Sequence, residues 1–226
     1  MVIPGITPVT KPMEVSFSES VGGEVDLSNK VIDNTYFNMN VANGDGYSST
    51  EQALILNSTT TAEQMNTIQN AEVGENSIRN NYNGIIFEVP KGKGTITVDT
   101  KTIGNHVLNL QIGNGSPTKI TKSERGTIDV LYNVTEPTYI YLYASSEDGS
   151  AARSGRASAA ANSVLLYGYK VVIGNDIAPG DANADGEINV TDIVMMVNII
   201  MSSGSRFDEQ EVKAILKDYG FIFKGE

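Results

Sequence analysis

The chain has no cysteine and no tryptophan, and it has one histidine among 226 residues. Without cysteine it can have no disulfide framework, thiolate metal site or cysteine nucleophile. No apolar run approaches the roughly 20 residues that cross a bilayer, so we expect no membrane insertion. Lys and Arg number 16 against 27 Asp and Glu, a net charge of −11. No basic stripe is present to neutralise phosphates, which argues against nucleic acid as a partner.

The sequence also gives little sign of catalysis. His106 begins a predicted strand and has no obvious nucleophile beside it. The paired carboxylates Glu147 and Asp148 lie in a stretch rich in Ser, Gly and Ala, residues 145–162, that is typical of a solvated loop. We therefore predict no catalytic residues and a protein that is not an enzyme.

Most of the chain has the alternating pattern of β-strands. The clearest predicted strands cover residues 85–89, 95–101, 106–112, 127–134, 138–143 and 163–173, and weaker ones cover 15–17, 35–39 and 53–57. Residues 63–72 could be a short helix or an irregular connection. Eight or nine short strands without intervening helices predict a mainly β fold, an antiparallel β-sandwich over residues 13–175.

The first twelve residues contain three prolines, which predicts an extended linker. They lack the basic start and apolar core of a signal peptide. We expect the natural protein to continue upstream of Met1.

Residues 181–192 carry the most specific motif of the chain. Oxygen-bearing side chains stand at loop positions 1, 3, 5, 9 and 12, with glycine at position 6, which is the spacing of a twelve-residue calcium loop. Position 7 supplies a backbone carbonyl. The predicted Ca²⁺ ligands are Asp181, Asn183, Asp185, Glu187 (through its carbonyl), Asn189 and Asp192.

Helices are predicted after this loop but not before it. Thr191 and Asp192 can cap a helix that continues to Met201, whereas Pro179 forbids a normal helix at the entrance. A second helix is predicted over residues 208–219, because Asp208 and Glu211 form a capping box. Residues 176–226 are therefore predicted to form a small α-helical calcium-loop module.

A calcium loop with only an exiting helix, spelled Gly-Asp-x-Asn-x-Asp-Gly-x-x-Asn-x-Thr-Asp from Gly180, resembles the first repeat of a type I dockerin. The likeness covers about a tenth of the chain, and no second calcium loop follows. It implies secretion or surface display and a cohesin-like or other surface protein as partner. In dockerins the positions of Val190 and Thr191 help to select that partner, while Val197 and Asn198 stand where basic residues often contribute.

The helix after the loop is apolar on two faces. One face can pack on the 208–219 helix, and the other includes Met195 and Ile199. This second face either packs within the chain or binds a protein partner, which a methionine-rich surface suits.

The order of strands from residue 84 to residue 173 resembles a jelly-roll carbohydrate-binding module, which would make a polysaccharide a second partner. Tyr139, Tyr141 and Tyr143 share one face of a predicted strand, and Ile140 and Leu142 share the other. If the aliphatic face is the core, the tyrosines form an exposed row that could bind glycan. If the tyrosines point inward, the row has only a packing role.

The sequence is interpreted as a non-catalytic, calcium-binding extracellular module of a bacterial surface protein. Its β-sandwich is a possible glycan binder, and its dockerin-like tail would mediate attachment or assembly. Two alternatives stay open: the accessory C-terminal part of a larger secreted glycoside hydrolase, and a purely structural unit without a ligand.

Overall fold

The computed structural model describes residues 3–21, 26–70, 80–147 and 162–174, together with Val194. The chain divides into two compact units, Met1–Ile173 and Gly174–Glu226. Almost all described residues belong to the first unit. Within the part of the chain so described, no helix is both long and apolar enough to cross a bilayer.

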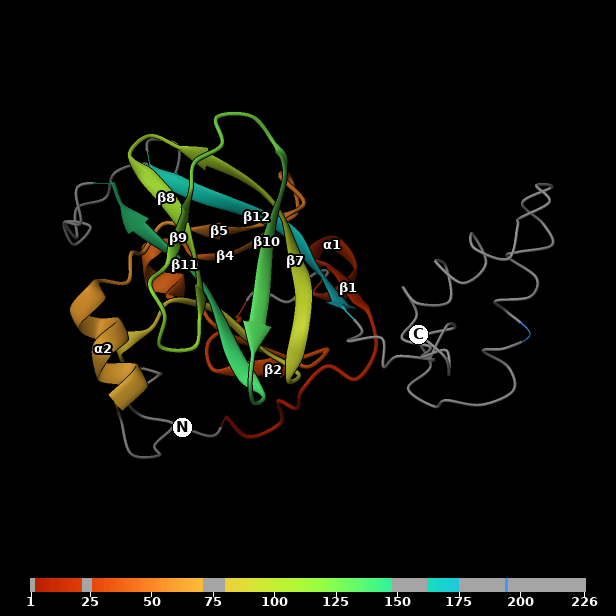
Figure 1. Ribbon diagram of the computed structural model, residues 1–226. Coiled ribbons are helices and arrows are strands. Elements are labelled where there is room, and N and C mark those ends of the chain that lie inside the picture. The colour runs from red at the N-terminus through yellow and green to blue at the C-terminus, as the bar shows by residue number, and fades with distance from the viewer. Residues whose placement is uncertain (1–2, 22–25, 71–79, 148–161, 175–193, 195–226) are drawn as a thin grey trace, which may run out of the picture. The chain divides into compact units, whose positions relative to one another are not determined.

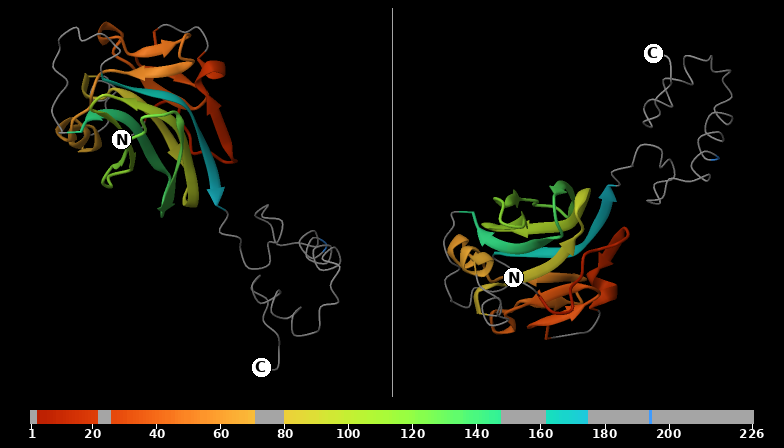
Figure 2. Two further views of the ribbon diagram at one scale, coloured as in Figure 1. Left: turned by 90° about the horizontal axis from the view of Figure 1, so that it is seen from above. Right: turned by 60° about the horizontal axis from the view of Figure 1, so that its bottom comes forward.

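The first unit is an antiparallel β-sandwich, as the alternating pattern predicted (Figures 1 and 2). Its two sheets have six strands each. We call them the β12 sheet and the β11 sheet. The β12 sheet has the order β10-β7-β12-β5-β4, with β1 also paired to β12, and the β11 sheet has the order β2-β3-β6-β11-β8-β9.

The elements follow one another along the chain as β1 (Met13–Ser16), α1 (Phe17–Ser20), β2 (Lys30–Ile32), β3 (Thr35–Asn38), the 3-10 turn η1 (Val41–Asn43), β4 (Gly46–Ser48), β5 (Ala53–Leu56), α2 (Ala62–Asn70), β6 (Gly84–Val89), β7 (Gly92–Ile103), β8 (His106–Ile112), β9 (Thr118–Ile120), β10 (Gly126–Val134), β11 (Thr138–Ser146) and β12 (Ser163–Gly174).

Alternation along the strands builds the main core between the sheets. On β7, Ile96 and Val98 are buried while Thr97 and Asp99 point to the other face. On β11, Ile140 and Leu142 enter the same core. The period of two that predicted these strands therefore also assigns their inward faces.

A second, smaller core lies on the outside of the β11 sheet. Here α2 contributes Met65 and Ile68, which pack with Ile3, Ile6, Tyr36, Tyr82, Ile86, Tyr141 and Tyr143. Figure 1 shows α2 lying beside this sheet. The segment 63–72 thus contains a helix, one of the two alternatives that the sequence allowed.

The N-terminal segment differs from the predicted extended linker. Ile3, Ile6 and Val9 are buried, and the Val9 N–H donates to the Glu88 carbonyl at 3.1 Å. The prolines do break regular structure there, but three aliphatic side chains at intervals of three residues bury themselves on the sandwich. The hydrophobic gain outweighs the linker-like composition.

Candidate functional site

The outer face of the β12 sheet carries the polar side chains that alternate with the core. On β7 these include Thr97 and Asp99, and on β10 Thr127 and Asp129. Asp99 lies opposite Thr127 in the register, and Thr97 opposite Asp129, whose carboxylate accepts the Thr97 hydroxyl at 2.7 Å. Polar side chains in facing rows therefore line this part of the outer face.

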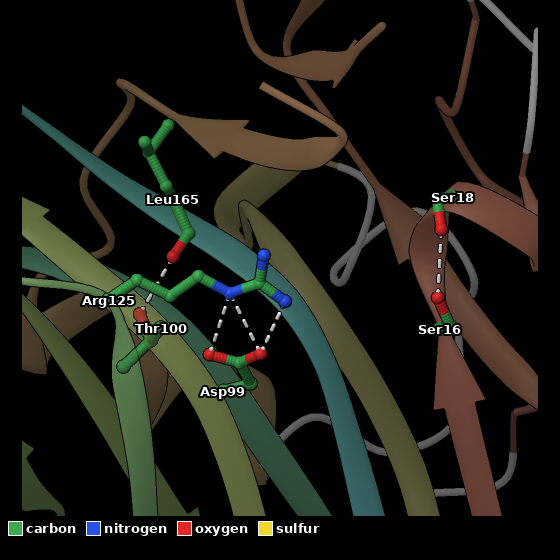
Figure 3. Close-up of polar contacts among 6 residues, drawn as sticks. All are labelled: Ser16, Ser18, Asp99, Thr100, Arg125 and Leu165. Carbon is green, nitrogen blue, oxygen red and sulfur yellow. Dashed lines mark hydrogen bonds and ion pairs between the residues drawn. The ribbon is translucent and has the colours of Figure 1, made fainter. Parts of the chain in front are cut away.

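Arg125, just before β10, reaches across this face (Figure 3). Its Nη2 and Nε donate to Asp99 Oδ2 at 2.7 and 3.0 Å, and its Cζ lies 3.9 Å from the centroid of the Tyr167 ring. The hydrogen bonds with Asp99 raise the pKa of the Arg125 guanidinium. The Arg125 side chain is 57% exposed, and pairs this open add little to stability. A rigid planar group held over an aromatic ring is, however, well prepared for recognition.

A pocket of about 350 Å³ surrounds this group. The volume lies in the range of small-ligand sites. β1, β7, β10 with the residue before it, and β12 all contribute to its lining: Glu14, Val15, Ser16, Thr97, Asp99, Arg125, Thr127, Tyr167, Gly168, Tyr169 and Lys170.

Tyr167 points into this pocket as the alternation of β12 requires, and an irregularity in the strand follows it. Val164 and Leu166 point into the core, but the next core residues are Tyr169 and Val171, so the alternation shifts by one residue. Such a shift is typical of a β-bulge, which often re-aims a side chain beside a functional site. A Cβ at Gly168 would lie 2.4 Å from the Val15 carbonyl oxygen, so only glycine lets β1 approach here.

Tyr139, Tyr141 and Tyr143 point away from the main core, as the alternative with an aliphatic core face required. They do not form the exposed row that this alternative expected. Ile140 and Leu142 form core, while Tyr141 and Tyr143 are 3% and 4% exposed on the opposite face. Tyr139 is half-buried, and its hydroxyl accepts the Ile3 N–H at 3.1 Å. Because α2 and the N-terminal segment cover this face, the expectation of an open aromatic platform is corrected. In this arrangement Tyr141 and Tyr143 have a packing role.

We expect these tyrosines to resist ionisation. Burial raises the pKa of Tyr143 from 10.0 to about 12, and burial raises that of Tyr141 still further. The unfolded chain therefore loses these protons first, so their contribution to stability is complete below pH 10 and is lost as pH rises toward 12 and beyond. A titration of tyrosinate absorbance should show Tyr141 and Tyr143 ionising only well above pH 10, together with loss of the circular dichroism signal. Titration of all tyrosines near pH 10 in a folded chain would contradict the buried cluster.

The residues considered for catalysis have structural contacts. His106 is 5% exposed, and its Nε2 lies 2.9 Å from the Asn57 carbonyl oxygen. The Glu147 N–H donates to the Asn105 carbonyl at 2.8 Å, while Asp148 lies outside the described residues. In the described ranges, no three or more His, Cys, Asp or Glu side chains gather into a metal-binding group.

The predicted calcium ligands Asp181, Asn183, Asp185, Glu187, Asn189 and Asp192 lie outside the described residues. So do the predicted partner-binding residues Val190, Thr191, Met195 and Ile199. Val194, between Asp192 and Met195, is helical and 52% exposed. Both sets of residues stay predictions.

No protein-family model matches the chain, and no curated protein matches it. Among solved structures, the CBM22-1 xylan-binding domain from Paenibacillus barcinonensis Xyn10C is 11% identical over 74% of this chain and 87% of that one, with a TM-score of 0.31. The EclA C-terminal domain, a sugar-binding protein, is 12% identical over 51% and 71%, with a TM-score of 0.28. A family two carbohydrate esterase from Cellvibrio japonicus is 11% identical over 57% of this chain but 29% of its own, with a TM-score of 0.31. Likenesses at this level assign neither a function nor a site.

Proposed function

We propose that the β-sandwich is a non-catalytic carbohydrate-binding module whose binding site is the pocket on the β12 sheet. The observation that carries the proposal is the Arg125 guanidinium, fixed by Asp99 and lying on the ring of Tyr167. Sugars present adjacent hydroxyl groups, which planar guanidinium and carboxylate groups bind in pairs. The Tyr167 ring beneath the guanidinium holds that group in place by a cation–π contact.

The charges of the pocket favour a neutral glycan. Arg125 is paired with Asp99, and Lys170 Nζ lies 3.7 Å from Glu14 Oε2. Two cations and two carboxylates leave no excess of either sign, so neither a phosphate nor an acidic sugar has a uniquely attractive partner. Hydroxyl groups can both donate to the carboxylates and accept from the cations.

Replacing Tyr167 or Arg125 with alanine is expected to weaken glycan binding about tenfold or more, a loss of at least ~1.4 kcal/mol. The ligand is first found by screening soluble polysaccharides by affinity electrophoresis, and the affinities are then measured by calorimetry. Leu131→Ala is the matched control, because Leu131 lies on β10 outside the pocket lining and is 77% exposed. Glycan affinities of Y167A and R125A equal to that of the control would overturn the assignment of the site.

For the second unit we propose a calcium-ordered, dockerin-like attachment module. The support is the ligand spacing from Asp181 to Asp192, where carboxylate and amide oxygens recur at the positions that calcium needs. Calcium would order the loop and the start of the following helix without taking part in chemistry. A surface protein would then bind through Val190, Thr191, Met195 and Ile199. A chain of this kind would act outside the cell, either on a surface protein or as an accessory part of a larger secreted glycoside hydrolase.

A further inference from the structure

β10 lies at one edge of the β12 sheet and is much longer than the other outer strands that the structure describes. Within the described ranges it pairs with β7 alone, over nine consecutive residues (Figure 1). The other outer strands, β1, β2, β4 and β9, have three or four residues each. Short edge strands are one way in which proteins prevent pairing with other chains. Among the described strands, β10 therefore leaves the longest row of backbone N–H and C=O groups facing away from its sheet.

β10 also lacks the features that protect an exposed edge. Its residues Gly126–Val134 include no proline and no lysine, its ladder with β7 has no bulge, and its single charged side chain is Asp129. Leu131 is 77% exposed on the outer face, and Ile128 and Val130 are only partly buried at the rim of the core. A long, regular and apolar edge of this kind is a surface to which another strand can be added.

The sequence of β10 is complementary to itself when two copies run antiparallel with Leu131 at the centre. In this register Leu131 packs on Leu131 of the second copy, Val130 faces Tyr132, and Asp129 faces Asn133. Apolar residues thus face apolar residues, and no like charges within the strand are opposed. A register centred on Val130 would place Leu131 against Asp129, and one centred on Asp129 would oppose two carboxylates.

We infer that β10 is a dimerisation edge whose partner is the β10 strand of a second copy of this chain. Antiparallel pairing of identical strands requires a two-fold axis perpendicular to the sheet, so the same surface is used by both copies. The two β12 sheets would form one continuous sheet with both pockets on the same side. The inference does not depend on what the pockets bind. Because each copy contributes one strand, the interface is small, and we expect a Kd on the order of 10⁻⁴ M.

Cysteine substitution tests the register directly, because the full chain has no cysteine of its own. In the paired strands, residue 131 of one copy lies about 4.5–5.5 Å from residue 131 of the other, which a disulfide can bridge. Asn133→Cys is the matched control: it is also exposed on β10, but the two copies of residue 133 would lie roughly 13 Å apart along the strands. Under mild oxidation near the expected Kd, L131C should form a covalent dimer at least tenfold faster than N133C. Equal rates for the two variants would overturn the inference.

Charge substitutions at Asn133 separate association from folding. N133D adds a carboxylate opposite Asp129 of the second copy and should weaken dimerisation about fivefold, whereas N133K should strengthen it by a similar factor. Within one chain Asn133 lies opposite Lys93 of β7, so in dilute solution N133D should have the higher Tm and N133K the lower.

Sedimentation equilibrium on the full chain measures the association. Lys119→Glu, an exposed charge change on the edge strand β9, should leave it unchanged. A chain that stays monomeric up to about 1 mM, or that associates equally in N133D and N133K, does not dimerise through β10.

Discussion

Replacing Phe87 with alanine is expected to lower the free energy of unfolding of the sandwich by about 3–5 kcal/mol. Phe87 on β6 is fully buried, and its ring stacks on that of Tyr169 from the opposite sheet, with centroids 4.1 Å apart and planes at 10°. The truncation therefore removes both buried area and an aromatic pair that joins the two sheets. Urea unfolding followed by circular dichroism measures the change.

Leu131→Ala is the control for this loss as well, because a side chain 77% exposed gives up little burial. Its free energy of unfolding should stay within about 0.5 kcal/mol of the wild type. A Phe87→Ala variant as stable as L131A would show that the two sheets do not pack through this ring.

Replacing Asp181 with alanine is expected to abolish tight calcium binding by the second unit. Asp181 occupies the first ligand position of the loop, and each carboxylate lost from a site with few charges weakens it steeply. Calorimetry on calcium-stripped protein should show one tight site in the wild type that is absent from D181A. The unfolding transition of the tail should become independent of calcium at the same time.

Glu209→Gln is the matched control for the calcium loop, since it removes an acidic group from residues 176–226 outside residues 181–192. It should bind calcium as the wild type does. If the wild type itself shows no tight site at about 1 mM calcium, the loop does not bind the ion and the prediction from its ligand spacing is wrong.

The strands that the sequence predicted best are those with long alternation. β8 (His106–Ile112) was predicted with the bounds observed, and β7 extends the predicted 95–101 at both ends. The three-residue strands β2, β4 and β9 were missed. Three residues do not establish a period, so these strands depend on pairing with neighbours that the local sequence does not reveal.

The binding face was harder to predict than the fold. The row Tyr139, Tyr141, Tyr143 repeats every second residue and so attracts notice, yet α2 and the N-terminal segment cover it. The periodicity of a strand predicts which side chains share a face, but it does not predict whether another segment of the chain packs on that face. Alternation with Val164 and Leu166 predicts that Tyr167 points away from the core, but nothing in the local sequence shows that Arg125 will lie on its ring.

The most direct test of the central claim is a nuclear magnetic resonance titration of the labelled chain with a neutral oligosaccharide from the best polysaccharide of the screen. We expect saturable shifts confined to the pocket on the β12 sheet, at Thr97, Asp99, Arg125 and Tyr167, with the tyrosine cluster under α2 unaffected. Shifts centred on the β11 sheet, or no shifts with any glycan, would contradict the assignment of this pocket as a carbohydrate-binding site.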